Sequence, residues 1–123
     1  MDLKEFNKPQ RQALLELAVL GMYADGHLSA AEDERVQRLL TAMGFGSDYE
    51  SAAQYDAAVA RVGRHSVTVD ATAAHARTLA QNFTTPEQRR FVHNILRDLV
   101  ASDGRISPQE STFLSALREA FQM

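Results

Sequence analysis

Apolar residues follow a helical spacing along almost the whole chain, and the strict alternation that is typical of strands is nearly absent. The composition agrees with this pattern, because it is rich in Ala, Leu, Glu, Gln and Arg, most of which favour helices. The sequence therefore predicts an all-α fold, a compact bundle of about six or seven helices.

The first predicted helix runs from about residue 8 to residue 24, with Asn7 as its N-cap and Pro9 in its first turn. Its segment LLELAVLGM is apolar on all sides, which predicts a central helix. Further helices are expected over about residues 30–43, 48–62, 69–83, 86–102 and 108–121. Gly44 is expected to end the second of them. The fifth carries Phe91, Ile95 and Leu99 on one stripe, with Val92 and Leu96 beside it.

One short motif occurs twice, as YADGHLSAAEDE over residues 23–34 and as ASDGRISPQES over residues 101–111. Both copies contain Asp, Gly, any residue, Leu or Ile, Ser, two residues of any kind, and Glu. These are Asp25, Gly26, Leu28, Ser29 and Glu32 in the first copy, and Asp103, Gly104, Ile106, Ser107 and Glu110 in the second. The repeat predicts two pseudo-symmetric helix-turn-helix halves that flank a middle helical pair, within a single domain over residues 1–123.

A metal-binding loop is one interpretation of this motif. Aligned on their glycines, both copies place Asp and Glu at the fifth and twelfth positions of a calcium-binding EF-hand loop. The first and third positions lack ligands, because they hold Gly and Tyr in one copy and Leu and Ala in the other. Useful affinity would therefore require the two corners to share one ion. The candidate ligands are Asp25, Glu32, Asp103 and Glu110, whose oxygens favour calcium, magnesium or manganese.

A helix corner without a metal is the other interpretation. Ser followed three residues later by Glu forms a capping box, which satisfies two backbone N–H groups at a helix start. The same pattern occurs as Ser47 with Glu50 and as Thr85 with Gln88, where no Asp-Gly pair precedes it. Capping therefore explains the Ser and Glu residues of both copies. It leaves Asp25 and Asp103 unexplained, because an acid at a helix C-terminus opposes the helix dipole.

With its paired motifs, the chain resembles the TerB-like family, named for tellurite-resistance TerB proteins and shared by the N-terminal region of some membrane-anchored DnaJ-type co-chaperones. The resemblance covers nearly the whole chain. It implies a helical bundle with pseudo-twofold halves, an acidic face proposed for metal binding, and a role in stress response or complex assembly rather than catalysis. The residues that carry this expectation are Asp25, Glu32, Asp103 and Glu110.

Few other chemistries find support in the sequence. The chain has no cysteine, which excludes disulfides and thiolate metal sites, and its four histidines are not paired at helical spacing. It also has no phosphate-binding loop and no nucleophile elbow. We therefore expect a non-enzymatic module. The alternative is a small all-α enzyme with a carboxylate-bound metal.

Charge and hydropathy limit the kinds of partner that we expect for this chain. The net charge is −3, and the acidic start of the second helix, at Glu32, Asp33 and Glu34, argues against binding to nucleic acid. The apolar run LAVLGMYA is too short to span a bilayer, and the start MDLKEFNK does not resemble a secretory leader. We expect a cytoplasmic protein with no membrane insertion and a protein partner. The sequence specifies neither that partner nor the oligomeric state.

Overall fold

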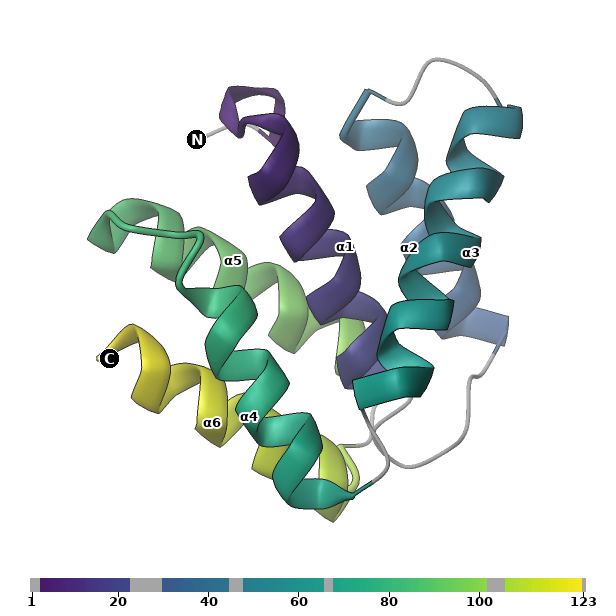
Figure 1. Cartoon of the computed structure of the whole chain (residues 1–123). Coiled ribbons are helices and arrows are strands. Elements are labelled where there is room, and N and C mark those ends of the chain that lie inside the picture. The colour runs from purple at the N-terminus through teal and green to yellow at the C-terminus, as the bar shows by residue number, and fades with distance from the viewer. Residues whose placement is uncertain (1–2, 23–29, 45–47, 66–67, 102–105, 123) are drawn as a thin grey trace.

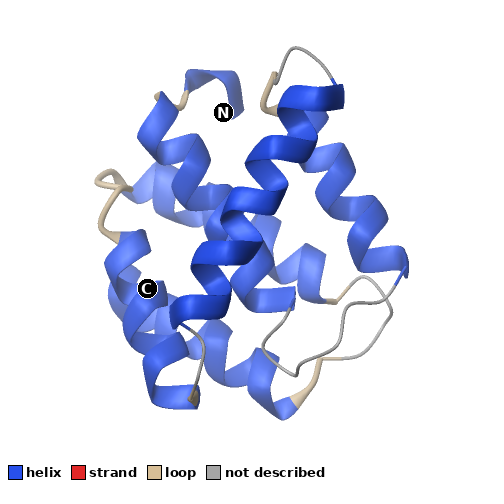
Figure 2. Ribbon diagram, turned by 45° about the vertical axis from the view of Figure 1, so that its right-hand side comes forward, coloured by secondary structure: helices blue, strands red, loops and turns tan. Residues whose placement is uncertain are grey.

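The computed structural model of the chain describes residues 3–22, 30–44, 48–65, 68–101 and 106–122. In these residues the regular structure is entirely helical (Figure 2). A short 3-10 helix, η1 (Leu3–Glu5), precedes α1 (Lys8–Met22), α2 (Ala30–Ala42), α3 (Asp48–His65), α4 (Val69–Ala80), α5 (Pro86–Val100) and α6 (Pro108–Phe121). The predicted all-α fold class is confirmed.

Helix α1 is the central helix of the bundle. In Figure 1 it lies between the α2–α3 pair on one side and α4, α5 and α6 on the other. It contacts all five of these helices, and every residue from Ala13 to Met22 is buried. The prediction that LLELAVLGM forms a central helix is therefore confirmed.

The helices around α1 bury amphipathic faces against it and against each other. On α5 the innermost side chains are Val92 and Leu96, whereas Phe91 and Ile95 are only partly buried. Phe91 and Ile95 of the predicted stripe thus lie at the edge of the core, whereas Leu99 is buried in it. The same core holds Val36, Leu39, Leu40 and Met43 from the second helix and its end, and Phe113, Leu114, Leu117 and Phe121 from α6.

Several helix ends follow the predicted signals. Asn7 caps α1 reciprocally: the Gln10 N–H donates to Asn7 Oδ1 at 2.9 Å, and the Asn7 N–H donates to Gln10 Oε1 at 3.1 Å. Thr85 and Gln88 form a capping box at the start of α5. After α2, Gly44 has a φ of 82°, the left-handed conformation that glycine adopts without strain.

The predicted end of the fourth helix, at residue 83, is wrong. Helix α4 ends at Ala80, where the backbone N–H groups of Gln81, Asn82 and Phe83 donate to the carbonyls three residues back. The side-chain amide of Asn82 also donates to the Leu79 carbonyl, at 2.9 Å. Phe83 is nevertheless fully buried, and its ring centroid lies 5.3 Å from that of Phe6. The apolar spacing therefore identified a core residue correctly but extended the helix too far.

The close approach of α1 and α6 depends on Gly21. A Cβ atom built on Gly21 would lie only 2.6 Å from Cε1 of the buried Phe113 ring. Such a distance is far inside van der Waals contact. Glycine at this position therefore lets α6 pack against the C-terminal end of α1.

We expect Gly21→Ala to destabilise the protein. The roughly 1–3 kcal/mol cost of overpacking against Phe113 exceeds the gain in helix propensity, about 1 kcal/mol. Gly63→Ala in α3 is the matched control, because a Cβ there meets no atom within 4 Å. Urea denaturation should show a lower midpoint for Gly21→Ala and an unchanged or higher one for Gly63→Ala. An increase in both would show that Phe113 moves aside easily.

Candidate functional site

The structure describes only part of the predicted cation site. Asp25 and Asp103 lie outside the described residues, as do the corner glycines Gly26 and Gly104. Glu32 lies in the first turn of α2, but its side chain is outside the described part of the structure. Glu110 is the one predicted ligand with a described side chain. The sharing of one cation by the two corners therefore stays a prediction.

Glu110 forms the capping box that the sequence predicts for the second corner. Its backbone N–H donates to Ser107 Oγ at 3.1 Å, and its Oε1 accepts from the Ser107 N–H at 2.9 Å. Pro108 occupies the first turn, where a missing N–H is harmless. The Glu110 side chain is buried as a result. One carboxylate oxygen of Glu110 thus already accepts a hydrogen bond from the backbone at the start of α6.

The helices next to the two corners belong to one packed unit. Helix α1 precedes the first corner, α5 precedes the second, and these two helices pack against each other. The contact between Gly21 and Phe113 also joins the end of α1 to α6. Among the side chains that the structure describes, no group of three or more Asp, Glu or His residues is arranged to hold a metal ion.

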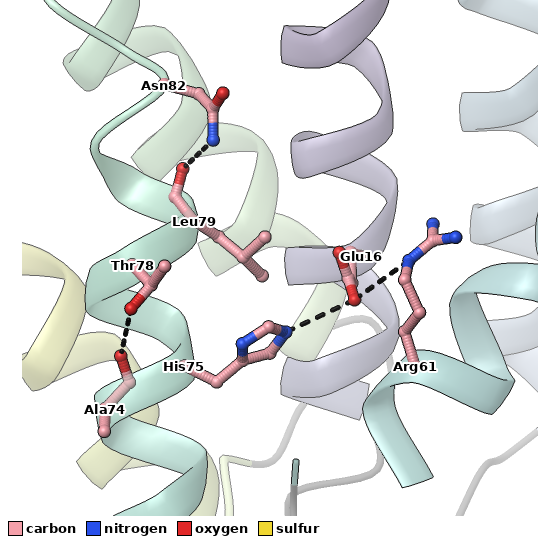
Figure 3. A network of polar contacts seen from close by, with 7 residues as sticks. All are labelled: Glu16, Arg61, Ala74, His75, Thr78, Leu79 and Asn82. Atoms are coloured by element: carbon pink, nitrogen blue, oxygen red, sulfur yellow. Dashed lines mark hydrogen bonds and ion pairs between the residues drawn. The ribbon is translucent and has the colours of Figure 1, made fainter. Parts of the chain in front are cut away.

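A cluster that we did not predict lies deep in the bundle around Glu16 of α1 (Figure 3). Glu16 Oε1 accepts a hydrogen bond from Arg61 Nε of α3 at 3.1 Å, and it lies 3.2 Å from His75 Nε2 of α4. The Glu16 side chain is only 7% exposed, whereas that of Arg61 is 33% exposed. One carboxylate oxygen therefore connects three helices.

The chemistry of this cluster suits a structural link better than a metal site. A buried carboxylate is costly unless it is paired and hydrogen-bonded, and Arg61 and His75 satisfy both requirements for Glu16. The guanidinium of Arg61 would also repel a cation placed on the same oxygen. A hydrogen bond from His75 Nε2 to the Glu16 carboxylate requires the tautomer that has its proton on Nε2.

A sequence signal for this cluster does exist. Glu16 is the one charged residue in LLELAVLGM, the segment whose apolar surroundings predict a central helix. A charge on such a helix needs buried partners, so its position indicates a polar contact inside the core. The sequence gives no indication that Arg61 and His75 are those partners, because they lie on helices far along the chain.

His93 of α5 is a second buried polar group, with a different environment. Its side chain is buried, and Nε2 has no hydrogen-bond partner. Desolvation lowers the pKa of His93 below its usual value of 6.5, and the positive charges of Arg118 and Arg97 lower this pKa further. The surroundings of His93 therefore favour the neutral form of its ring.

Comparison of the chain with models of known protein families, with curated proteins and with solved structures finds no match. None of the described helices combines the length and the apolar character that are needed to cross a membrane.

Glu16→Gln should lower the free energy of unfolding by about 2 kcal/mol, because it leaves Arg61 and His75 without the carboxylate. The loss is smaller than for a fully buried pair, since water reaches part of Arg61. Glu34→Gln is the matched control: it breaks the Glu34–Arg38 pair, which is largely exposed, and should cost under about 1 kcal/mol. Equal losses in chemical denaturation would contradict a special role for Glu16.

His93 should make the protein less stable in acid. Because its folded pKa lies below 6.5, the unfolded chain binds the proton more readily, and stability falls as the pH drops through 6.5 toward the folded pKa. The slope contributed by one such group is at most about 1.4 kcal/mol per pH unit. Urea denaturation between about pH 7.5 and about pH 5.5 spans the usual histidine pKa. Over this range, the free energy of unfolding should fall less for His93→Gln than for the wild type. Identical losses would exclude His93 as the cause.

Proposed function

We propose that the chain is a non-catalytic interaction module of the TerB-like type that acts in the cytoplasm and binds a protein partner. The observation that carries this proposal is the motif Asp-Gly-x-Leu/Ile-Ser-x-x-Glu, which occurs in the sequence between α1 and α2 and again between α5 and α6. The packing of α1 against α5 supports it, because equivalent helices of the two pairs share one core.

The acids of the motif are the proposed binding determinants. The cap at Ser107 accounts for Glu110, and hence for one of the four candidate ligands. Asp25 and Asp103 follow α1 and α5, where an acid opposes the helix dipole unless a cation or a basic partner lies nearby. A divalent cation held by Asp25, Glu32, Asp103 and Glu110 would provide that compensation, and a basic surface on a protein partner would do so equally.

A role in stress response, including tellurite resistance, rests on the family resemblance alone. The chemical part of the proposal is narrower: the acidic corners bind calcium, magnesium or manganese through oxygen ligands. The same residues would serve the alternative, a small all-α enzyme with a carboxylate-bound metal. Cation binding is therefore the first property to measure.

Calorimetric titration with each of the three cations should show binding to the wild-type protein and none to an Asp25→Asn, Asp103→Asn double variant. Asn keeps the shape of Asp but removes the charge, so the caps at Ser29 and Ser107 are expected to persist. An Asp56→Asn, Asp98→Asn double variant is the control, because it removes two exposed acids from α3 and α5. It should bind like the wild type.

Two outcomes would decide against the cation site. One is the absence of both heat and thermal stabilisation at millimolar cation. The other is equal weakening in the corner variant and the control, which would indicate a general effect of negative charge. A protein partner is tested with the same pair of variants: a partner that copurifies with the wild type and the control, but not with the corner variant, binds the acidic corners.

A further inference from the structure

The two outer helix pairs, α1–α2 and α5–α6, correspond in register. The same number of residues separates the start of α1 from that of α5, the end of α1 from that of α5, and the start of α2 from that of α6. It also separates Gly44 from Gln122, which lie just beyond the ends of α2 and α6 and both adopt a positive φ, of 82° and 58°. The contacts between the pairs match as well, because α1 packs against α6 and α5 packs against α2. Positions in one pair therefore have structural equivalents in the other.

Helix α4 covers the α1–α6 contact and has no counterpart at the equivalent α2–α5 contact. It packs against both α1 and α6 (Figure 1). Its His75 lies 3.2 Å from Glu16 of α1. Its Arg77 lies 3.5 Å from Glu119 of α6. In the described part of the chain, α1 is the one helix that packs against both α2 and α5, and it does so from the core.

The residues equivalent to the two that hold α4 are exposed. Glu16 of α1 corresponds to Asn94 of α5, and Glu119 of α6 corresponds to Thr41 of α2. Both Asn94 and Thr41 are exposed to solvent. A helix in the position equivalent to that of α4 would therefore lie over these two residues.

A groove between α2 and α5 lies next to these two positions. Its lining includes Ala42 and Ile95, the residues that directly follow the two exposed positions, together with the buried Leu39 and Leu99. The volume of the groove is about 270 Å³, which is below the roughly 300–1,000 Å³ that is typical of small-molecule sites. The groove therefore suits apolar side chains of a docked helix better than a small molecule.

The charges of the lining do not select the partner. They are Arg35 and Arg38 of α2 and Asp98 of α5, and thus include both signs. Arg38 is paired with Glu34 at 2.6 Å, and Asp98 lies 3.7 Å from Arg97. Apolar contact and the shape of the groove therefore determine what binds there.

The same charged residues distinguish this groove from the permanently covered position of α4. Arg38 and Asp98 are exposed, whereas their equivalents at the α1–α6 contact, Ala116 and Leu20, are buried. A polar rim around an apolar centre is typical of interfaces between proteins that also exist apart. The groove therefore has the composition of a site that is covered only while a partner is bound.

We propose that the α2–α5 groove binds an amphipathic helix of a protein partner, in the position that α4 occupies on α1 and α6. The contact face of that helix is small and aliphatic, like that of α4, whose buried residues are Ala76, Leu79 and Ala80. A leucine enters the groove over Leu39 and Leu99, and the alanines beside it let the helices approach closely. This docking surface is additional to the proposed function and does not depend on the acidic corners.

A peptide of residues 68–82 is a suitable probe, because it carries the buried face of α4. Since short isolated helices are only marginally stable, the peptide carries Ala74→Glu and Thr78→Lys, joined by a lactam bridge. Both of these positions are exposed in the protein. Nuclear magnetic resonance of the isotope-labelled protein should show, on addition of the peptide, shifts of the amide signals of Leu39, Ala42 and Leu99.

Matched variants test whether the peptide binds in the groove. Ala42→Lys places a long side chain in the groove and should raise the dissociation constant at least about tenfold. Ala60→Lys makes the same change at an exposed position of α3, outside the groove, and should leave the dissociation constant unchanged. Leu79→Asp in the peptide should weaken binding as much as Ala42→Lys does. Circular dichroism and thermal unfolding establish that both protein variants are folded.

Several results would overturn the proposal. One is the absence of shifts at millimolar peptide, and another is equal weakening by Ala42→Lys and Ala60→Lys. Shifts confined to α1 and α6 would show that the peptide only replaces the chain's own α4. Sedimentation of the protein alone tests for a second copy: a dimer that Ala42→Lys dissociates would assign the groove to self-association instead.

The corner variant separates this proposal from the proposed function. Asp25→Asn with Asp103→Asn should bind the peptide like the wild type, because neither residue lines the groove. If the wild type binds the peptide but no cation, the cation site fails and the helix-docking groove stands. If it binds a cation but not the peptide, the groove fails and the cation site stands.

Discussion

Burial of the apolar segment of α1, from Ala13 to Met22, is the constraint on which the rest of the structure depends. A helix that is apolar on all sides must be covered on all sides, and five helices of the chain are arranged around it. Two side-chain requirements follow from this arrangement. Where α6 comes closest, only a residue without a Cβ fits, and Gly21 provides it under the Phe113 ring. Where a charge lies on the buried surface, partners must come from the surrounding helices, and Arg61 and His75 provide them for Glu16.

Two of the buried ionisable residues, Glu16 and His93, offset the cost of burial in different ways. One Glu16 oxygen is shared by an arginine and a histidine from two other helices, and these contacts offset the cost of its burial (Figure 3). His93 gives up its charge, since burial and the neighbouring Arg118 and Arg97 all favour the neutral ring. The first solution connects α1, α3 and α4 to each other. Because the His93 ring favours its neutral form, protonation of this residue on α5 opposes folding.

The surface features used in the two proposals lie on different parts of the same framework. The acidic corners connect α1 to α2 and α5 to α6, whereas the groove lies between α2 and α5, with Asp98 and Leu99 close in sequence to the second corner. Helices α2 and α5 therefore contribute to both: their corner-side ends lie next to the repeated motif, and their facing sides form the groove.

Local physics in the sequence determined the helices and many of their ends. Apolar spacing identified the all-α class and the central helix, and capping residues such as Asn7, Thr85 and Ser107 determined where helices begin, because each acts on backbone groups within three residues. The predicted end of α4 is wrong, because the backbone after Ala80 forms hydrogen bonds three residues apart, while Phe83 remains buried in the core. Glu16 could be singled out as a charge on an apolar helix. Tertiary structure alone decided which residues contact Glu16, why position 21 must be glycine, and where a groove forms beside Ile95. Each of these features depends on helices that are distant in the sequence and become neighbours only after packing.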